Sequence, residues 1–311
     1  MCGAKVRILI ADDDTLSVRM MERILVLAGY EVIVADNGDD AMRHLQSPDG
    51  PRLALLDWMM PALDGPEVCR ELRKDVDRPY IYIVLLTSKD SKEDLVMALE
   101  AGADDFLTKP CNAGELKARL RTGHRILLLE DKLVEEREEM RFKATHDMLT
   151  GLWNRGAVQA ALSYELRRLH REQSSVAVLL CDVDHFKSVN DSYGHLVGDE
   201  VLREVADRLL SAVRPGDVVG RYGGEEFLIV LRNCDHLRIA EAAERVRVTI
   251  ASMLIQARGR SLAITISVGA TVAEHSERVL VPEILVGEAD RALYRAKQQG
   301  RNRVEISETI V

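Results

Sequence analysis

The sequence predicts two domains joined by a long helix: an α/β domain with a doubly wound, five-stranded parallel sheet, then an α+β domain with a largely antiparallel sheet. Three observations support this fold class. Five strand-length apolar runs alternate with four helical patterns in residues 5–120. Residues 113–146 hold no proline, as one continuous helix requires. Later, two apolar runs flank Tyr222–Phe227, whose paired glycines give the backbone freedom of a hairpin turn.

The first domain is assigned to residues 1–120. Its strands are expected at Val6–Ala11, Glu31–Ala35, Arg52–Leu56, Tyr80–Leu86 and Asp104–Leu107. Its helices are expected between them, at Thr15–Ala28, Asp39–Gln46, Gly65–Lys74 and Ser91–Glu100. A helix after each strand returns the chain to the same edge of the sheet. The strands therefore run parallel, and ligands bind at their carboxyl ends.

Residues 121–146 are assigned to a linker helix, within a helical stretch that starts near residue 113. Two seams of apolar residues repeat along it at heptad spacing. They are formed by Ile126, Leu133 and Met140, and by Leu120, Leu127 and Val134. Such seams favour pairing with a second copy of the chain as a coiled coil. Because both are short, a single solvated helix is the alternative.

The second domain is assigned to residues 147–311. Its strands are expected at Val176–Cys181, Val218–Tyr222, Phe227–Leu231 and Leu262–Thr271. Its helices are expected at Gly156–His170, Gly198–Val213, His236–Gln256 and Pro282–Gln299. The hairpin turn between the second and third of these strands makes them antiparallel, which favours an α+β arrangement with a largely antiparallel sheet.

Composition excludes several classes of protein. With 47% apolar and 30% charged residues, the 311-residue chain is an ordinary globular protein. Its net charge of −9 argues against binding to nucleic acid or to an anionic membrane. Five scattered cysteines without a CxxC pair indicate reduced thiols, with no disulfide framework and no zinc site. The sequence shows neither a membrane-spanning run nor a signal peptide, so we expect a cytoplasmic protein.

Acidic residues gather at the strand ends of the first domain. Asp12 and Asp13 follow the first strand and Asp57 follows the third, so their carboxylates should share one pocket and bind Mg²⁺. Thr87 and Lys109 end the fourth and fifth strands. This set suits transfer of a phosphoryl group to Asp57, with Lys109 and the metal neutralising the phosphoryl oxygens. Helix-capping acids beside a surface lysine are the alternative.

These residues, in this order, resemble the response regulator receiver family across residues 5–120. The resemblance implies that Asp57 is the phosphoacceptor and that a cognate histidine kinase is its partner. It also implies a Mg²⁺ site of Asp12, Asp13, Asp57 and the Met59 carbonyl. Thr87 and Phe106, with Lys109, would form the switch, and the Lys109–Pro110 peptide bond would be cis.

A second set of acids and cations lies in the second domain. If the strand ends adjoin, Asp182, Glu225 and Glu226 converge on a metal ion. Lys297 and Arg301 are four residues apart, a spacing that suits the grip of a triphosphate. Metal-binding acids that face phosphate-binding cations are typical of nucleotidyl transfer. A hairpin with solvated acids is the alternative for the turn taken alone.

Five ordered motifs resemble the GGDEF diguanylate cyclases over about residues 145–306. They are Asp147–Arg155, Asp182–Asp191, Gly194–Asp199, Arg221–Phe227 and Ala292–Arg303. The resemblance implies condensation of two GTP into cyclic di-GMP, with Mg²⁺ as cofactor. Since one domain offers one GTP site, it also implies a homodimer. A cyclic di-GMP-binding response regulator without catalysis, and a phosphotransfer adaptor, are the alternative functions.

The same resemblance implies a role for each motif residue. Asp182, the Val183 carbonyl, Glu225 and Glu226 would bind Mg²⁺, and Glu225 would also act as the base. Lys187 would stabilise the transition state, and Lys297 and Arg301 would hold phosphates. Asn190, His195 and Asp199 would contact the substrate, with Asn190 and Asp199 reading guanine. Glu225 stands where the family name has Asp.

Arg214 and Asp217 form an RxxD tetrad shortly before the hairpin turn. At this offset the tetrad resembles the product-inhibition site of the same family. Arg168 and Arg245 are further ligands of that site by their position in the sequence. An exposed ion pair between Arg214 and Asp217 is the alternative.

Overall fold

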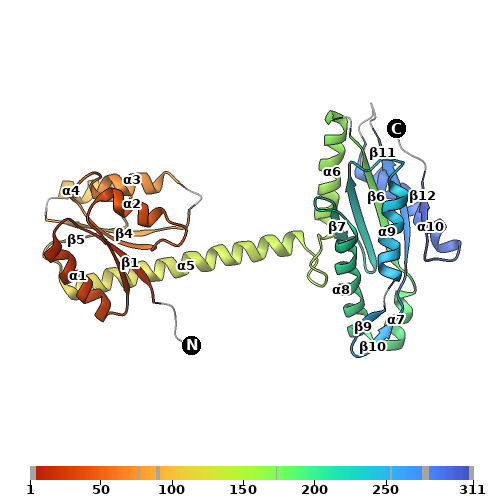
Figure 1. Ribbon diagram of the computed structural model, residues 1–311, viewed down its shortest axis with the longest axis horizontal. Helices are drawn as coiled ribbons and strands as arrows, with labels where there is room; N and C mark the ends of the chain where they lie inside the picture. The colour runs from red at the N-terminus through yellow and green to blue at the C-terminus, as the bar shows by residue number, and fades with distance from the viewer. Residues whose placement is uncertain are drawn as a thin grey trace. The chain divides into compact units, whose positions relative to one another are not determined.

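The computed structural model describes residues 5–75, 78–88, 92–172, 174–252, 254–274 and 280–307. The chain divides into two compact units, residues 1–137 and 138–311, which are described separately here (Figure 1). Within the described residues, no helix combines the length and the apolar character that crossing a bilayer requires.

The first unit contains the predicted five-stranded parallel sheet. Its strands are β1 (Arg7–Ala11), β2 (Glu31–Ala35), β3 (Leu53–Asp57), β4 (Tyr82–Thr87) and β5 (Asp105–Thr108). Their order is β2-β1-β3-β4-β5, and every pair is parallel. The strand order reverses at β1, so the carboxyl ends of β1 and β3 lie next to each other. Ligand sites of doubly wound sheets form at this reversal.

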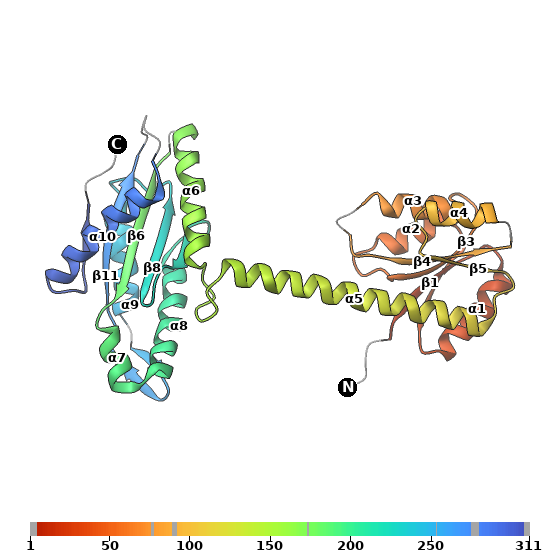
Figure 2. The ribbon, with the colours of Figure 1, turned by 180° about the vertical axis from the view of Figure 1, so that it is seen from behind.

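Helices cover both faces of this sheet. They are α1 (Thr15–Leu27), α2 (Gly38–Gln46), α3 (Gly65–Arg73) and α4 (Lys92–Glu100). Apolar side chains of α2, α3 and α4 pack on one face, and those of α1 and the next helix pack on the other (Figure 2). Asp14 caps α1 by accepting from two of its first N–H groups. Ser91, the expected start of α4, lies outside the described residues.

The predicted long helix is α5 (Ala113–Thr145), which is continuous over 33 residues. Leu120 and Leu127 are buried in the core of the first unit. Arg52, beside β3, binds Glu130 at 2.5 Å and also pairs with Asp131. The helix therefore stays packed on the first unit beyond residue 120. The seam of Leu120, Leu127 and Val134 cannot pair with a second copy, because its first two residues are already buried.

The second unit holds a mixed sheet of the order β12-β11-β6-β8-β7. Its strands are β6 (Val176–Val183), β7 (Val218–Arg221), β8 (Glu226–Arg232), β11 (Ile266–Ala273) and β12 (Val304–Ile306). Only β11 and β12 are parallel in this sheet, so the largely antiparallel sheet is confirmed for the described residues. A separate hairpin pairs β9 (Ile255–Ala257) with β10 (Arg260–Leu262).

Two pairs of helices sandwich this sheet. The helices are α6 (Arg155–Glu172), α8 (His195–Ala212), α9 (Ile239–Ala251) and α10 (Pro282–Gln298). The core on one face comes from α6 and α10, and the core on the other from α8 and α9. The short α7 (Phe186–Tyr193) connects β6 to α8.

Three sequence predictions for this unit were wrong in detail. The helix expected to reach Gln256 ends at Ala251, and the strand expected from Leu262 begins at Ile266. Between them, Arg258 and Gly259 have positive φ values and turn the chain into the β9–β10 hairpin. The helix expected from Gly198 starts at His195, and α7 was not predicted.

Candidate functional site

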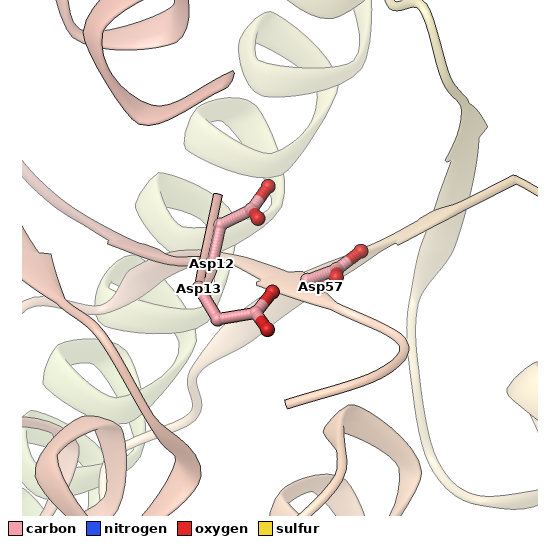
Figure 3. Close-up of side chains that lie close together, drawn as sticks. All are labelled: Asp12, Asp13 and Asp57. Carbon is pink, nitrogen blue, oxygen red and sulfur yellow. The ribbon is translucent and has the colours of Figure 1, made fainter. Parts of the chain in front are cut away.

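Three aspartates meet where β1 and β3 end. Asp12 and Asp57 are buried, Asp13 is exposed, and carboxylate oxygens of all three lie within 4.8 Å of one another. Figure 3 shows the three side chains on the same side of this edge of the sheet. Among the described residues, this is the one group of three potential metal-ligating side chains so close together. Oxygen ligands at this density fit a hard divalent cation such as Mg²⁺.

Lys109 lies over this cluster. Its Nζ is 2.7 Å from Oδ2 of Asp12 and 2.7 Å from Oδ1 of Asp57. Burial opposes the charge of the ammonium group, but bonds to the two aspartates raise the pKa of Lys109 overall. Burial raises the pKa of Asp57, although Lys109 acts against this effect. The Lys109–Pro110 peptide bond is cis, as the resemblance implied.

The other predicted residues of this site surround Asp57. Thr87 is buried at the end of β4, and its carbonyl accepts from the N–H of Lys109 at 2.7 Å. Phe106 is half-buried on β5, and Met59 is exposed two residues after Asp57. A phosphoryl group on Asp57 would therefore meet an ammonium group, near a strand end that carries a hydroxyl. This arrangement can stabilise a carboxyl phosphate.

The second site is built on the β7–β8 hairpin. The carbonyl oxygen of Glu226 accepts from the N–H groups of Tyr222, at 2.8 Å, and of Gly223, at 3.2 Å. A Cβ atom at Gly223 would come within 2.5 Å of Oε2 of Glu226. The first glycine of the turn therefore makes room for the Glu226 carboxylate to fold back over the turn.

Asp182 and Glu226 face each other across β6 and β8. They are paired residues in the antiparallel register, and the N–H of Val183 donates to the carbonyl of Glu225 at 3.2 Å. Burial raises the pKa of both Asp182 and Glu226, and the neighbouring Asp182 raises that of Glu226 further. The buried carboxylate of Asp182 and the half-buried one of Glu226, beside a backbone carbonyl, are oxygen ligands that suit Mg²⁺. The predicted side-by-side placement of these strand ends is thus observed.

Two cations at the end of α10 approach this pair. Nζ of Lys297 is 2.7 Å from Oδ2 of Asp182, so a positive charge already stands beside this carboxylate. Arg301 follows Gly300 in a turn of positive φ, and its charge lowers the pKa of Asp182 against the opposing effect of burial. Two acids, from β6 and β8, and a lysine of α10 therefore come together.

The remaining predicted substrate residues lie on α7 and α8. Asn190 packs against Gly198, where a Cβ atom would come within 2.0 Å of Oδ1 of Asn190, and Asp199 is the next residue. Lys187 and His195 are exposed. No hydrogen bond or ion pair in the described part of the chain joins these four side chains to the two paired carboxylates. Asn190 therefore lies beside the backbone position that precedes Asp199 on α8.

A cavity of about 130 Å³ contains the RxxD tetrad. Its charged lining consists of Arg214, Asp217, Arg232, Arg238, Glu241 and Arg245. Three of the four predicted residues therefore line one cavity. The sequence analysis missed Arg232 and Arg238, which flank the connection from β8 to α9. Four arginines against two acids make this cavity suited to an anion.

Arg168 stands apart from this cavity. It lies on α6, with its Nη1 3.7 Å from Oε2 of the buried Glu165. Glu165 also lies 2.7 Å from Nε of Arg232, which does line the cavity. Asp217 accepts from the backbone N–H groups of Arg214, at 3.0 Å, and Arg232, at 3.1 Å. Its carboxylate thus orders the backbone of the tetrad.

Comparison with known proteins decides the family. The sequence model of the diguanylate cyclase GGDEF domain matches residues 144–303, and that of the response regulator receiver domain matches residues 8–121. The chain belongs to the GGDEF diguanylate cyclase family. The expected architecture of a receiver domain followed by a GGDEF domain is confirmed.

Two curated relatives and one solved structure illustrate these similarities. The response regulator PleD of Caulobacter vibrioides is 34% identical over 305 residues, which are 96% of this chain and 65% of PleD. The diguanylate cyclase DosC of Escherichia coli is 38% identical over 187 residues, 60% of this chain and 39% of DosC. A crystal structure of the coiled coil and GGDEF domain of DgcB from Caulobacter crescentus, in complex with c-di-GMP, is 31% identical. It aligns with a TM-score of 0.55 and covers 62% of this chain and 99% of that one.

One contact in the GGDEF domain had no counterpart in the sequence analysis. Arg221, just before the GGEEF turn, binds Asp147 of the first motif through Nη1, at 3.1 and 3.2 Å. Its Nη2 also donates to the carbonyl of Gly224 at 2.7 Å. The two residues are 74 positions apart, so only the fold brings them together.

Proposed function

We propose that this protein is a diguanylate cyclase whose activity is controlled by phosphorylation of Asp57. In each reaction cycle two GTP molecules would form one cyclic di-GMP and two pyrophosphates. The observation that carries the proposal is the cross-strand pair of Asp182 and Glu226, with Lys297 bound to Asp182 at 2.7 Å. A metal-binding acid pair and a phosphate-binding cation are the two halves of a nucleotidyl transfer site.

Each half-reaction forms one bond and breaks one. The 3′-oxygen of one GTP attacks the α-phosphorus of the other, and pyrophosphate leaves with the electrons of the broken P–O bond. Glu225 accepts the proton of the 3′-hydroxyl, while Lys187, Lys297 and Arg301 offset charge on the phosphates. In the second half-reaction the roles are exchanged: the 3′-oxygen of the other nucleotide attacks the remaining α-phosphorus, the second pyrophosphate leaves and the ring closes.

The carboxylates of Asp182, Glu225 and Glu226, with the Val183 carbonyl, would hold Mg²⁺ in the GGDEF domain. Asp12, Asp13, Asp57 and the Met59 carbonyl would hold it in the receiver domain. When bound, Mg²⁺ polarises the reacting phosphate and favours ionisation of the attacking hydroxyl.

Asn190 and Asp199, whose positions adjoin at Gly198, would read guanine. A carboxylate can accept from both N1–H and N2–H₂ of guanine, whereas adenine presents an acceptor at N1. ATP would leave the Asp199 carboxylate facing a like acceptor, so it is rejected. His195 would contact the substrate from the start of α8.

A homodimer follows from the stoichiometry, because each domain offers one GTP site and the product contains two GMP units. The exposed seam of Leu133 and Met140 on α5 supports pairing of the linker helices. A histidine kinase would supply the phosphoryl group. Since α5 starts four residues after Lys109, a change at Asp57 can bias the pairing of two helices.

Product inhibition would occur in the cavity of Arg214, Asp217 and Arg245. The four arginines that line it support the binding of an anionic ligand such as cyclic di-GMP. Arg168 would contribute from a second domain of the pair, since it does not line the cavity of its own domain.

Chromatography of the products from GTP and Mg²⁺, with and without beryllofluoride as a phosphoryl mimic, tests the proposal. Cyclic di-GMP should form, and more of it with beryllofluoride. Asp182→Ala and Glu226→Ala should abolish its formation while thermal unfolding stays cooperative. Binding of cyclic di-GMP without turnover would instead indicate a sensor, and neither activity would indicate a phosphotransfer adaptor.

A further inference from the structure

Asp184 lies two residues after Asp182 and is buried, with 6% of its surface exposed. Three donors surround its carboxylate. Oδ1 accepts from Oγ of Ser267 at 2.6 Å, and Oδ2 accepts from Oγ1 of Thr265 at 2.7 Å. Oδ2 also accepts from the backbone N–H of Asn302 at 3.0 Å. One carboxylate thus joins the end of β6 to the start of β11 and to the segment that follows α10.

The segment after α10 has an unusual backbone. Gly300, Arg301 and Asn302 have φ values of 114°, 62° and 46°. Arg301 and Asn302 are not glycines, so their left-handed conformation costs energy that contacts from outside the turn must offset. The N–H of Arg301 donates to the carbonyl of Ala296 at 3.0 Å, and this hydrogen bond closes the C-terminal end of α10.

Asn302 receives two of these outside contacts. Its N–H binds Asp184, and its Oδ1 accepts from Nη1 of Arg247 on α9 at 2.6 Å. Glu244 in turn binds Arg247 through two contacts, at 2.9 and 2.6 Å. The turn is therefore fixed at its backbone by the buried acid and at its side chain by an arginine of α9.

We propose that Asp184 is a positioning residue for Arg301. By holding the amide of Asn302, it fixes the left-handed turn that carries Arg301 at the end of α10. The short segment at and just after the end of β6 then sets the position of both the metal-binding acid and a phosphate-binding cation. This inference rests on the proposed function, in which Arg301 holds the triphosphate of GTP.

The consequence is specific to phosphates. Asp184→Asn keeps the size of the side chain but replaces the charged carboxylate, which has two acceptor oxygens, with a neutral amide, which has one. The contact with Asn302 then loses its charged acceptor, so the turn is held less firmly and the KM for GTP should rise about tenfold while kcat falls less. Binding of GMP, which lacks the outer phosphates, should not change.

A double-mutant cycle with Arg301→Ala separates this role from a general structural one. If Asp184 acts through Arg301, Asp184→Asn should change neither the KM nor the affinity for GTP once Arg301 is absent. Ser267→Ala is the matched control, because it removes a donor to Oδ1 and leaves the Asn302 contact at Oδ2. Its KM should stay within about twofold of the wild-type value.

Arg247→Met provides an independent variant that leaves the buried acid intact. It releases the side chain of Asn302 from the outer side of the turn, so the KM for GTP should rise in the same direction. This rise, too, should vanish in the Arg301→Ala background. If Asp184→Asn fails to unfold cooperatively, the Arg247→Met cycle still tests whether this turn acts through Arg301, and an unchanged KM in Arg247→Met would overturn the inference.

All measurements use the full chain, with calorimetric titrations of GTP and GMP in addition to steady-state rates. An unchanged ratio of GTP to GMP affinity in Asp184→Asn, or equal losses with and without Arg301, would overturn the inference. The binding ratio decides it even if the wild-type protein makes no cyclic di-GMP. A wild-type protein that makes no cyclic di-GMP would refute the proposed function but not this inference.

Discussion

Arg221 donates from Nη1 to both carboxylate oxygens of Asp147, at 3.1 and 3.2 Å, while its Nε and Nη2 donate to the carbonyl of Gly224. Asp147 lies two residues after the end of α5, and Gly224 lies in the GGEEF turn. Burial alone would raise the pKa of Asp147, but the bonds from Thr150 and Arg221 lower it overall. One guanidinium thus connects the end of the linker helix to the turn that carries Glu225.

We therefore predict that Asp147→Asn lowers the rate of cyclic di-GMP formation in the presence of beryllofluoride by about tenfold, as for loss of a charge-assisted hydrogen bond. The reason is that Arg221 would still donate to the Gly224 carbonyl in the turn but would no longer be fixed by a charged partner at position 147. Initial rates at saturating GTP measure the effect. Glu204→Gln, which breaks the ion pair with Arg208 on α8, is the control and should leave the rate within about twofold. Equal losses in both variants would contradict the link.

The receiver domain should accept phosphate on Asp57. Lys109 already binds both Asp57 and Asp12 at 2.7 Å, so a cation is in place to offset the phosphoryl charge. Beryllofluoride should increase both the dimer fraction, measured by light scattering, and the rate of cyclic di-GMP formation. Asp57→Asn should respond in neither assay. If the mimic binds and the rate stays flat, the receiver domain does not control this cyclase.

The strand ends of the receiver domain could be predicted because they depend on local sequence. Each apolar strand is followed by polar or charged residues. Because the strands are parallel, their ends bring Asp12, Asp57 and Lys109 together. The Asp182–Glu226 pair followed in the same way from the acids at the end of β6 and at the start of β8, because these two strands pair side by side in the sheet. The residues at the end of a strand can be read from the sequence, and the parallel or antiparallel pairing of neighbouring strands brings those ends together.

Features that depend on distant packing could not be predicted. The heptad seam of Leu120 and Leu127 suggested a second pairing surface, but these residues fill the core of their own domain. Arg232 joined the anion cavity only because β8 ends beside α9. The helix α7 was not predicted because its eight residues, about two turns, are too few to show a helical repeat of apolar residues.

The ion pair of His236 and Glu274 should make stability depend on pH. Oε1 of Glu274 lies 2.6 Å from Nδ1 of His236, and this contact raises the pKa of His236 above 6.5. The backbone N–H of His236, which donates to the same oxygen at 3.0 Å, and then the imidazole lower the pKa of Glu274 below 4.5. The stabilisation from His236 is complete below pH 6.5 and is lost as pH rises through its raised pKa. That from Glu274 is complete above pH 4.5 and is lost as pH falls through its lowered pKa.

Both contributions are therefore present at pH 5–6, and that of His236 is lost at pH values above its raised pKa. His236→Gln should lower the melting temperature more at pH 6 than at pH 9. Glu274→Gln should remove the same pH dependence, and the double variant should show no further loss. A decrease of equal size at both pH values would show that the pair contributes only neutral hydrogen bonds.

Product inhibition should depend on Arg214. A second anionic guanine ligand needs cations of its own on a chain of net charge −9, and the cavity supplies four arginines. Arg214 can stack on a base or donate two bonds to a phosphate, whereas the Asp217 carboxylate already orders the backbone through two N–H groups. Arg214→Ala should therefore raise the product concentration for half-inhibition about tenfold. This change corresponds to a loss of roughly 1.4 kcal/mol in the free energy of product binding.

The rate without product should barely change in this variant, because β7 separates the cavity from the GGEEF turn. Inhibition should be non-competitive with GTP, since the cavity and the Asp182–Glu226 pair share no residue. Arg238→Ala gives a matched comparison: it lines the same cavity from outside the tetrad and should weaken inhibition in the same direction. Inhibition curves that coincide for the wild type and both variants would show that the arginines of this cavity do not bind the product.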